Sequence, residues 1–341
     1  MIKSADTLQS VLVHVGLDRL GDGLLKLPFV RGLRRAFPHA RLTWFAGKET
    51  TVYAGALNAL VADQLDEIIE YGGIGHSPKE LFARRPLPDR SFDLVIDTQR
   101  NFSTALSAMR IRHRYFISPA AKFLLSSARP KSGYKFPRAM QRQMLDLLEI
   151  ASGKTFPTPD RLDLDIPATF REQARVLLPD GANYIAFAPG SGGRPKCWPL
   201  DRFMAVAASL QQTGTRPVFL IGPQELEWAE VIRQQLPEAL MPLQAGQGAQ
   251  SHNFNPLLSI ALAERMSAAV SNDSGIAHML AVGGAPLVAL YGPTVYEKFP
   301  PMCPHIAVVR AATFGSREMS AIPADAVIAA LQGLLAKAPA S

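Results

Sequence analysis

Short apolar runs alternate with longer segments of mixed polarity along this chain. The runs at 10–15, 41–46 and 91–97 have the length of β-strands, and the segment after the first run has a helical pattern that ends near Phe37 and Pro38. Strands separated by helical segments are typical of a parallel sheet built from strand–helix–strand units. We therefore expect the N-terminal part to form an α/β domain.

The alternation restarts after a linker at 153–160, which is rich in proline and turn-forming residues. We expect a fold of two Rossmann-like, doubly wound domains, with an N-terminal domain over 1–165 and a C-terminal domain over 166–341. The last predicted helix either packs on the C-terminal domain or returns to pack on the N-terminal domain. The predicted strands of the second domain are 184–188, 217–221, 268–270 and 286–290, and its predicted helices are 199–213, 225–236, 256–266, 276–282 and 322–336.

Three polar turns follow apolar strands, at 21–23, 189–199 and 271–275. Loops after parallel strands lie at the carboxyl edge of the sheet, where open α/β sheets bind their ligands. If two such domains face each other, these turns meet in an interdomain cleft. The segment 98–145 is expected to be helix and irregular loop.

The turn at 271–275 is the most informative of the three. A helix that begins after a strand directs unpaired N–H groups and the positive end of its dipole toward a phosphate, and Gly275 allows close approach. An ordinary capped helix is the alternative. Asp273 and His278 are five residues apart, which is not a metal-binding spacing on a helix, and His278 can also be a buried, hydrogen-bonded helix residue.

The other two turns offer further chemistry. Glycines at 190, 192 and 193 free backbone N–H groups for an anion, and Lys196 adds a full positive charge, unless it is a surface lysine. The pattern is not a Walker A loop, and the first strand is not followed by the glycine motif of nicotinamide-binding domains. Asp22, between two glycines, suits a general base, a ribose ligand or a helix cap.

The positive charge of the chain is unevenly distributed. The net charge is +7, and residues 1–165 hold 24 Lys and Arg against 17 Asp and Glu, whereas residues 166–341 hold 12 of each. Ten basic residues and no acidic residue occur between Thr98 and Leu145. Such a segment attracts polyanions, which include nucleic acid, anionic lipid and a phosphorylated or carboxylated substrate, or it is a solvated face without a partner. No RNA- or DNA-binding signature accompanies it, so nucleic acid is not expected.

Cysteine content and hydropathy indicate the cellular compartment of the protein and its relation to membranes. The two cysteines, Cys197 and Cys303, are far apart and fit no metal spacing, which is typical of a reduced, cytoplasmic protein. Residues 1–6 do not start a signal-peptide pattern, and no apolar run approaches the roughly 20 residues that cross a bilayer. We expect a protein that is soluble or lies on a membrane surface.

Taken together, the motifs resemble a known enzyme family. Residues 20–28, 189–193 with 196–199, and 271–278 with 289–294 occur in the order found in the ADP-heptose:lipopolysaccharide heptosyltransferases. These are inverting glycosyltransferases of family 9 with the GT-B fold, in which two Rossmann-like domains face a cleft. The resemblance spans roughly residues 10–300, and it depends on the combined set because each motif alone is weak.

The resemblance implies an ADP-sugar donor in the C-terminal domain and a lipopolysaccharide core acceptor in the N-terminal domain. Asp22 matches the general base, and Lys196 matches a lysine beside the donor phosphates. Gln224 and Glu225 compete for the position that contacts the ribose. The donor-binding residues that we infer are Ser191, Gly192, Gly193, Gln224, Asp273, Ser274, Gly275 and His278.

The resemblance also implies that no metal or other cofactor is needed, because protein positive charge stabilises the leaving ADP. The basic segment would contact the anionic acceptor and the inner face of the cytoplasmic membrane. Alternatives are another nucleotide-sugar transferase or epimerase on the same scaffold, and a non-catalytic nucleotide- or glycan-binding protein. The candidate acceptor- or membrane-facing residues are Arg110, Arg112, Arg114, Lys122 and Lys131.

Overall fold

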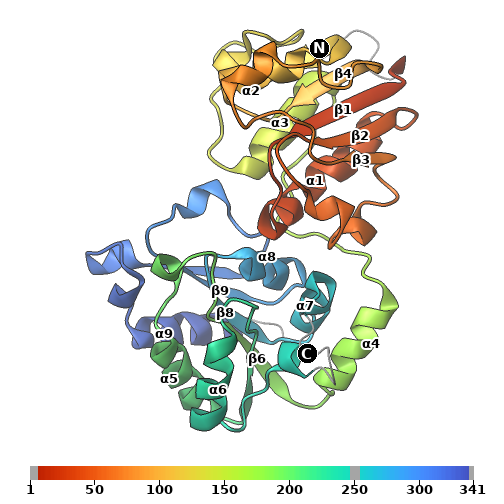
Figure 1. Ribbon diagram of the computed structural model, residues 1–341. Coiled ribbons are helices and arrows are strands. Elements are labelled where there is room, and N and C mark those ends of the chain that lie inside the picture. Colours follow the sequence, from red (N-terminus) through yellow and green to blue (C-terminus); the bar gives the residue numbers. More distant parts are fainter. Residues whose placement is uncertain (1–6, 246–253, 338–341) are drawn as a thin grey trace. The chain divides into compact units, whose positions relative to one another are not determined.

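The computed structural model describes residues 7–245 and 254–337 (Figure 1). These residues belong to two compact units. The first is Met1–Pro159 with Glu297–Phe299, and the second is Asp160–Tyr296 with Pro300–Ser341. The division falls a few residues before the expected boundary at 165. Residues 1–6, on which the expectation of no signal peptide depends, lie outside the described residues.

The first unit contains a five-stranded parallel sheet with the order β3-β2-β1-β4-β5. Its strands at 10–15, 41–46 and 91–97 confirm the predicted ones. The elements, in chain order, are β1 (Ser10–Val15), α1 (Leu20–Ala36), β2 (Arg41–Ala46), β3 (Glu67–Ile69), β4 (Ser91–Asp97), α2 (Phe102–Met109), β5 (Arg112–Ile117) and α3 (Met140–Ser152).

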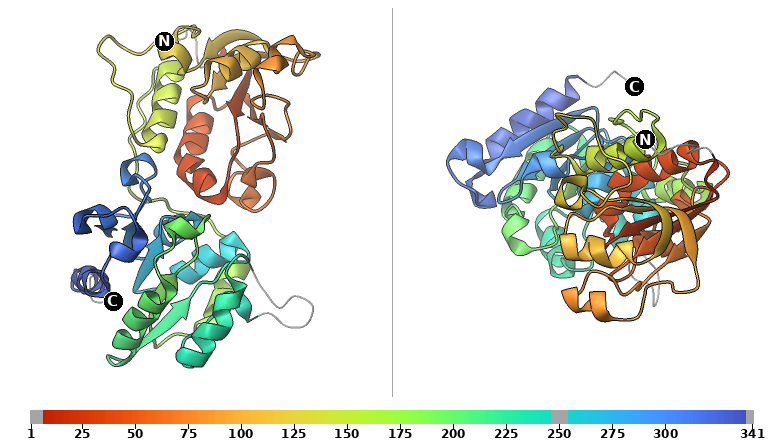
Figure 2. Two further views of the ribbon diagram at one scale, coloured as in Figure 1. Left: turned by 60° about the vertical axis from the view of Figure 1, so that its left-hand side comes forward. Right: turned by 90° about the horizontal axis from the view of Figure 1, so that it is seen from above.

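Successive strand residues point to opposite faces of a sheet. Because the strands of the first sheet carry apolar residues on both faces, helices cover both of them. Leu12, Val95 and Phe116 share one buried cluster with Ala108 of α2. Helices α1 and α3 pack against each other, and the left view of Figure 2 shows them side by side. Because these helices start near the carboxyl edge of the sheet, the first turn of α1 lies where the ligands of such sheets bind.

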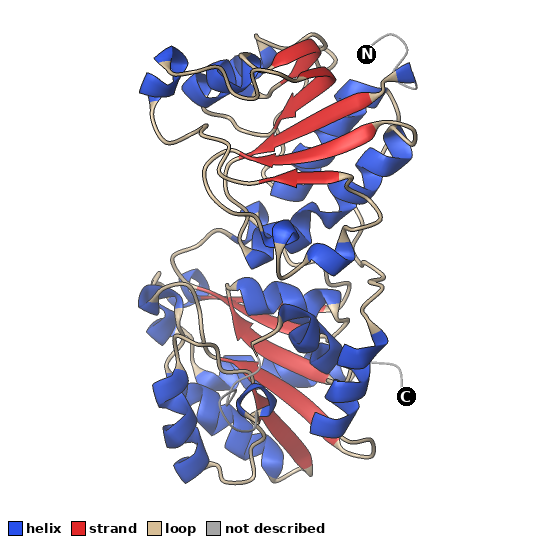
Figure 3. Ribbon diagram, turned by 45° about the vertical axis from the view of Figure 1, so that its right-hand side comes forward, coloured by secondary structure: helices blue, strands red, loops and turns tan. Residues whose placement is uncertain are grey.

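The second unit repeats this plan with a parallel sheet in the order β10-β9-β8-β6-β7, and Figure 3 shows the two sheets in red. The α/β, GT-B-type fold class is confirmed. The elements are α4 (Ala168–Leu177), β6 (Asn183–Ala188), α5 (Leu200–Gln211), β7 (Thr215–Phe219), α6 (Leu226–Gln235), α7 (Pro256–Ala263), β8 (Ala268–Asn272), α8 (Gly275–Val282), β9 (Leu287–Tyr291), β10 (Ile306–Arg310) and α9 (Ala324–Leu335).

Two separate cores form on the faces of the second sheet. Ala269 and Leu287 belong to a cluster that includes residues of α4, α7 and α8. Val270 and Val288 belong to the opposite cluster, which includes residues of α5, α6 and α9. Helix α9 thus packs within the second unit, on its own sheet, which places the last helix that the sequence left open.

The prediction for 98–145 is wrong in part. The segment does contain helix and loop, but Arg112–Ile117 forms strand β5, which pairs with β4 at the edge of the sheet. An edge strand has a solvent-facing side that tolerates charged residues at alternate positions. The strands β3 and β10 were also not predicted, and β7 begins two residues earlier than expected.

Candidate functional site

Asn272 connects two of the predicted loops in the second unit. It is the last residue of β8, which pairs with β6 so that Ala188 lies beside Ser271. The buried Asn272 side chain donates from Nδ2 to the carbonyl oxygen of Pro189 at 2.6 Å, and its Oδ1 accepts from the amide of Trp198 at 3.0 Å. One amide therefore holds both ends of the glycine-rich loop. Sequence reasoning missed this role of Asn272.

Three residues that were predicted to contact the ADP-sugar donor lie together at these loops, namely Ser191, Lys196 and Asp273. Ser191 Oγ donates to the carbonyl oxygen of Asp273 at 2.9 Å. Lys196 Nζ lies 3.9 Å from Asp273 Oδ2, and the lysine side chain is 41% exposed. A contact of this length between partly exposed groups is weak. The ammonium group is therefore available for a ligand anion at the same place.

The start of α8 is open to an anion. Ser274 is the N-cap residue and has extended backbone angles, but its hydroxyl makes no capping bond in the described structure and donates instead to the carbonyl of Asn272 at 3.3 Å. The first amides of a helix have no partner within the helix, and they favour phosphate groups. Gly192 has free space where a side chain would begin. The predicted loops thus combine backbone donors with the charge of Lys196.

His278 lies in the first turns of α8 and is buried. Burial lowers the pKa of its imidazole to about 4, and the Asp273 carboxylate opposes this shift only in part. Its Nδ1 has no hydrogen-bond partner among the described residues. The imidazole is therefore neutral at pH 7, so any contact with a ligand would be a hydrogen bond and not an ion pair.

A pH dependence of stability follows from the burial of His278. Between about pH 6.5 and 4 the unfolded imidazole binds a proton and the folded one does not, so the free energy of unfolding falls as the pH falls through this range. The whole shift corresponds to on the order of 3 kcal/mol. We expect His278→Gln to flatten this dependence, as measured by urea unfolding at pH 7 and pH 4.5. His305→Gln, at an exposed histidine, is the control, and equal slopes for His278→Gln and wild type would contradict the prediction.

Glu225 and Gln224 differ clearly in their surroundings. Glu225 is buried, and a Cβ placed on Gly190 or Gly222 would come within 3 Å of its carboxylate. The amide of Ser191 hydrogen-bonds this carboxylate, while burial raises its pKa. Gln224 is exposed. The structure therefore brings Glu225, and not the Gln224 side chain, against the glycine-rich loop.

In the first unit, Asp22 is the third residue of α1 and is partly exposed. Its Oδ2 accepts a long bond of 3.5 Å from the amide of Arg19, so it serves as a helix cap. A Cβ on Gly23 would stand 2.5 Å from the Val52 side chain, and the Tyr53 hydroxyl donates to the Gly23 carbonyl at 2.6 Å. The backbone beside Asp22 is therefore tightly fixed. The weak cap leaves the carboxylate available for other chemistry.

A buried polar network, which sequence reasoning missed, fixes the loop before α1. Asp18 Oδ1 pairs with the ammonium group of Lys26, and Oδ2 accepts from Trp44 Nε1 and Thr51 Oγ1, each at 2.9 Å. Burial raises the pKa of Tyr53 well above its usual range, and the carboxylates of Asp18 and then Asp22 add to the shift. The only signal in the sequence was a lysine on an apolar helix face, and its partner could not be identified.

The predicted basic residues have different environments. Arg110 donates to the carbonyls of Glu80 and Ala83 at 2.5 Å each, so it holds the neighbouring turn. Arg112 and Arg114 are exposed on one side of β5. Lys122, in the 3-10 helix η5 (Ala120–Phe123), and Lys131, in the segment before α3, are also exposed.

Lys122 lies in a strained turn. Three successive residues, Ala121, Lys122 and Phe123, have φ values of 48°, 54° and 65°. Left-handed backbone costs roughly 1–2 kcal/mol for each residue that has a Cβ. Such strain persists only where the surroundings hold it, and it is often found at functional sites. The turn follows β5, at the carboxyl edge of the first sheet.

Two Rossmann-like units, one of which presents a glycine-rich loop, a lysine and the start of a helix together, give the chain the GT-B fold class. The family model for glycosyltransferase family 9 (heptosyltransferase) matches residues 82–321. The chain belongs to this family.

Curated relatives agree with this family. The chain is 31% identical over 322 residues to lipopolysaccharide heptosyltransferase 2 of Escherichia coli (strain K12), and the match covers 89% of this chain and 88% of that protein. The protein of the same name from Salmonella typhimurium is 25% identical over 322 residues, with the same shares covered. Both matches extend through nearly the whole of both described units.

Solved structures share the fold. The glycosyl transferase family 9 structure from Veillonella parvula has a TM-score of 0.71 at 23% identity and covers 98% of this chain and 99% of its own. The E. coli ADP-heptose lps heptosyltransferase II has a TM-score of 0.65 at 21% identity, with 96% and 99% covered. The UDP-GlcNAc 2-epimerase of Methanocaldococcus jannaschii is more distant, with a TM-score of 0.52 at 11% identity and 96% and 93% covered.

Proposed function

We propose that this chain transfers a heptose from an ADP-heptose donor to a lipopolysaccharide core acceptor. The observation that carries the proposal is the assembly of Lys196, Ser191 and Asp273 at the start of α8, in a chain of glycosyltransferase family 9. The long match to lipopolysaccharide heptosyltransferase 2 of E. coli supports the choice of sugar and acceptor. The solved E. coli heptosyltransferase WaaC with ADP supports the nucleotide.

The donor would bind to the second unit through its diphosphate. Amides of Gly192 and Gly193 and the first amides of α8 supply hydrogen bonds, and Lys196 supplies a full positive charge. Negative charge increases on the diphosphate as the bond to the sugar breaks. Donors that are already in position stabilise this charge without reorganisation, so they favour the transition state over the bound substrate. We assign the ribose contact to the carboxylate of Glu225, because it lies against the glycine-rich loop whereas Gln224 is exposed.

Asp22 would act as the general base on the acceptor. It takes the proton of an acceptor hydroxyl while that oxygen attacks the anomeric carbon of the heptose. The new carbon–oxygen bond forms as the bond to the diphosphate breaks, and ADP leaves with the bonding electrons. Attack opposite to the leaving group inverts the anomeric configuration. This single displacement needs the donor and the acceptor bound at the same time.

The activity can be tested with ADP-heptose and a series of truncated lipopolysaccharide cores. We expect one acceptor to gain a single heptose by mass spectrometry, with one ADP released for each transfer and inverted anomeric configuration by NMR. We expect EDTA to leave the rate unchanged, because the proposed mechanism uses protein charge only. If no core is extended and UDP competes with the donor better than ADP does, another nucleotide-sugar enzyme on this scaffold is the better assignment.

We also propose that the first unit lies against an anionic membrane, as expected for the cytoplasmic face of the inner membrane. Across residues 7–245 and 254–337, each helix is too short or too polar to cross a bilayer. The 3-10 helix η4 (Pro78–Phe82) exposes 92% of the Phe82 side chain, and Arg84 and Arg85 follow it. Arg110 ties this turn to the end of α2. An exposed ring beside positive charge suits the interface of an anionic bilayer.

Replacement of Phe82 by serine is expected to weaken binding to phosphatidylglycerol vesicles about tenfold, because the ring no longer enters the interface. Vesicle sedimentation measures this, and binding should also weaken as salt is added. Phe314→Ser, at an exposed phenylalanine of the second unit, is the matched control. Equal binding by the two variants would show that Phe82 does not contact the membrane.

A further inference from the structure

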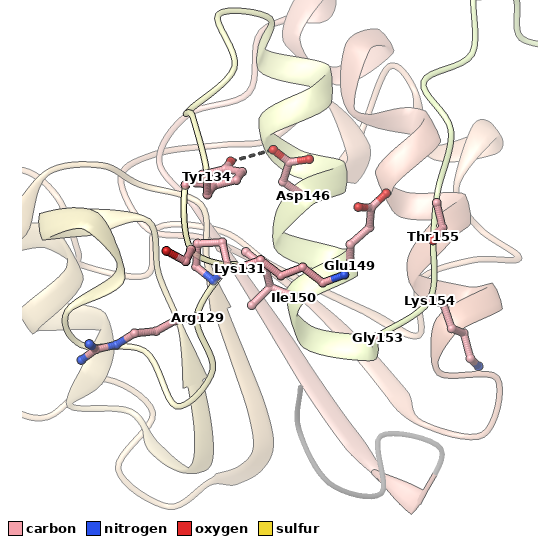
Figure 4. A pocket seen from close by; sticks show the side chains of 12 residues that line it. Arg129, Lys131, Tyr134, Asp146, Glu149, Ile150, Gly153, Lys154 and Thr155 are labelled. Atoms are coloured by element: carbon pink, nitrogen blue, oxygen red, sulfur yellow. Dashed lines mark hydrogen bonds between the residues drawn. The ribbon is translucent and has the colours of Figure 1, made fainter.

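A pocket of about 590 Å³ lies in the first unit beside the second half of α3. Figure 4 shows that the segment carrying Arg129 and Tyr134 forms one wall, and that α3 with the turn after it forms the other. Its volume is in the range of small-molecule binding sites. The lining residues are Arg129, Pro130, Lys131, Ser132, Gly133, Tyr134, Asp146, Glu149, Ile150, Gly153, Lys154 and Thr155.

The acidic groups of this pocket are already neutralised and held in place. Arg142 donates from Nε to Asp146 Oδ1 at 2.6 Å and from a terminal nitrogen to Glu149 Oε1 at 2.7 Å. The Tyr134 hydroxyl donates to Asp146 Oδ2 at 2.6 Å. Burial, and then Asp146, raise the pKa of Tyr134, so it keeps its proton. The pocket therefore presents fixed carboxylate and hydroxyl oxygens that can accept hydrogen bonds from sugar hydroxyls.

Basic residues outnumber acidic residues along the lining of the pocket, and Figure 4 shows the Arg129 and Lys154 side chains extending away from Asp146 and Glu149. Arg129, Lys131 and Lys154 line the pocket, in addition to the arginine that neutralises the two acids. The guanidinium of Arg129 donates to the carbonyl of Leu124 at 3.2 Å, and Lys131 is exposed. Within residues 7–245 and 254–337, neither side chain forms an ion pair with a carboxylate, and the two nearby acids pair with Arg142 instead. Guanidinium and ammonium groups that have no carboxylate partner bind phosphate oxygens favourably.

The pocket lies far from the proposed base along α1. Lys154 Nζ donates to the carbonyl of Ala36, at the end of α1, whereas Asp22 lies in the first turn of that helix. Fourteen residues of helix at 1.5 Å each separate these positions by about 20 Å. A monosaccharide in the pocket cannot present its hydroxyl to Asp22, but an oligosaccharide of several units can reach both places.

We propose that this pocket binds a phosphorylated sugar of the acceptor, several units away from the hydroxyl that reacts. The inference rests on the proposed function for the identity of the acceptor. The phosphate contacts Arg129 and Lys131, and sugar hydroxyls donate to Asp146 and Glu149. A concave pocket with fixed carboxylates suits a saccharide, whereas a bilayer surface would need an exposed convex face. The pocket thereby selects acceptors by a feature remote from the reacting group.

The test is calorimetric titration with a deacylated, phosphorylated lipopolysaccharide core oligosaccharide, and with the same oligosaccharide after removal of its phosphates. No donor is present. We expect wild type to bind the phosphorylated form about tenfold more tightly, and Arg129→Ala/Lys131→Ala to lose this preference. Lys135→Ala/Arg138→Ala removes the same charge from exposed positions of the same segment outside the pocket, and it should keep the preference.

Several results would overturn the pocket assignment. They are equal affinity of wild type for the two oligosaccharides, equal loss in the two double variants, and displacement of the oligosaccharide by phosphatidylglycerol vesicles or by inorganic phosphate at the same phosphate concentration. Because binding is measured without the donor, failure to transfer heptose would count against the proposed function and leave this result standing. A preference for phosphate that depends on Arg129 and Lys131 supports the pocket in either case.

Discussion

Replacing Asp22 by asparagine is expected to slow heptose transfer about 10²- to 10⁴-fold, the usual contribution of a general base. Asparagine keeps the size of the side chain and an oxygen that can accept from the amide of Arg19, so the start of α1 should remain intact. It cannot take the proton of the acceptor hydroxyl. Initial rates with saturating donor and acceptor measure the effect, and ADP affinity should stay within about twofold of wild type because ADP binding is assigned to the second unit.

A matched control separates loss of the base from loss of charge. Asp63→Asn makes the same change at an exposed aspartate of the first unit, and it should leave the rate near the wild-type value. The melting temperatures of both variants should match wild type. A rate for Asp22→Asn close to that of Asp63→Asn would reduce Asp22 to a helix cap, which is the alternative that the sequence left open.

The fold could be predicted largely because both units follow one simple pattern. Buried parallel strands such as β1 and β8 read as short apolar runs, and a polar turn marks the carboxyl end of each. The same turns contain the candidate chemistry, because the ligand edge of the sheet is where strands end. Asp273 is far in sequence from Ser191 and Lys196, but we expected the two loops together for this reason, and the structure brings the three residues together.

Two of the missed strands, β3 and β5, lack this pattern. In β5 the exposed residues Arg112 and Arg114 make the start of the strand charged. Only its pairing with β4 and the burial of Phe116 and Ile117 hold it in the sheet. Strand β3 is three residues long and partly exposed throughout. Neither strand could be recognised from local hydrophobicity, because neighbours distant in sequence determine both.

Side-chain partners were also beyond the reach of the sequence. The pairing of Asp18 with Lys26 depends on the direction in which α1 leaves its loop, and a buried ion pair of this kind is stabilised by the further bonds from Trp44 and Thr51. The choice between Gln224 and Glu225 depends on a shift of one residue in the loop before α6. The structure buries Glu225 beside two glycines, where the absence of Cβ atoms leaves room for the carboxylate, and leaves Gln224 exposed.

Lys196→Ala is expected to lower both the rate and the affinity for ADP. Loss of one positioned charge at a developing anion typically costs about 10²- to 10³-fold in turnover. Among the residues that the structure describes, the Lys196 ammonium contacts only Asp273, at 3.9 Å, so its removal should not disturb the loop, which depends on Asn272. Rates and calorimetric ADP titrations measure the two effects. Lys337→Ala, at an exposed lysine of the second unit, is the control.

The contrast between Lys196→Ala and Asp22→Asn is what distinguishes the two roles. A general base acts on the acceptor proton, so its loss should change the rate and spare the affinity for ADP. A cation beside the diphosphate contacts both the bound ADP and the charge that develops as ADP leaves, so its loss should change both quantities. If Lys196→Ala kept the ADP affinity and the rate of wild type, the diphosphate would have to lie elsewhere. The 3.9 Å contact between Lys196 Nζ and Asp273 Oδ2 would then be a weak surface contact without a role in donor binding.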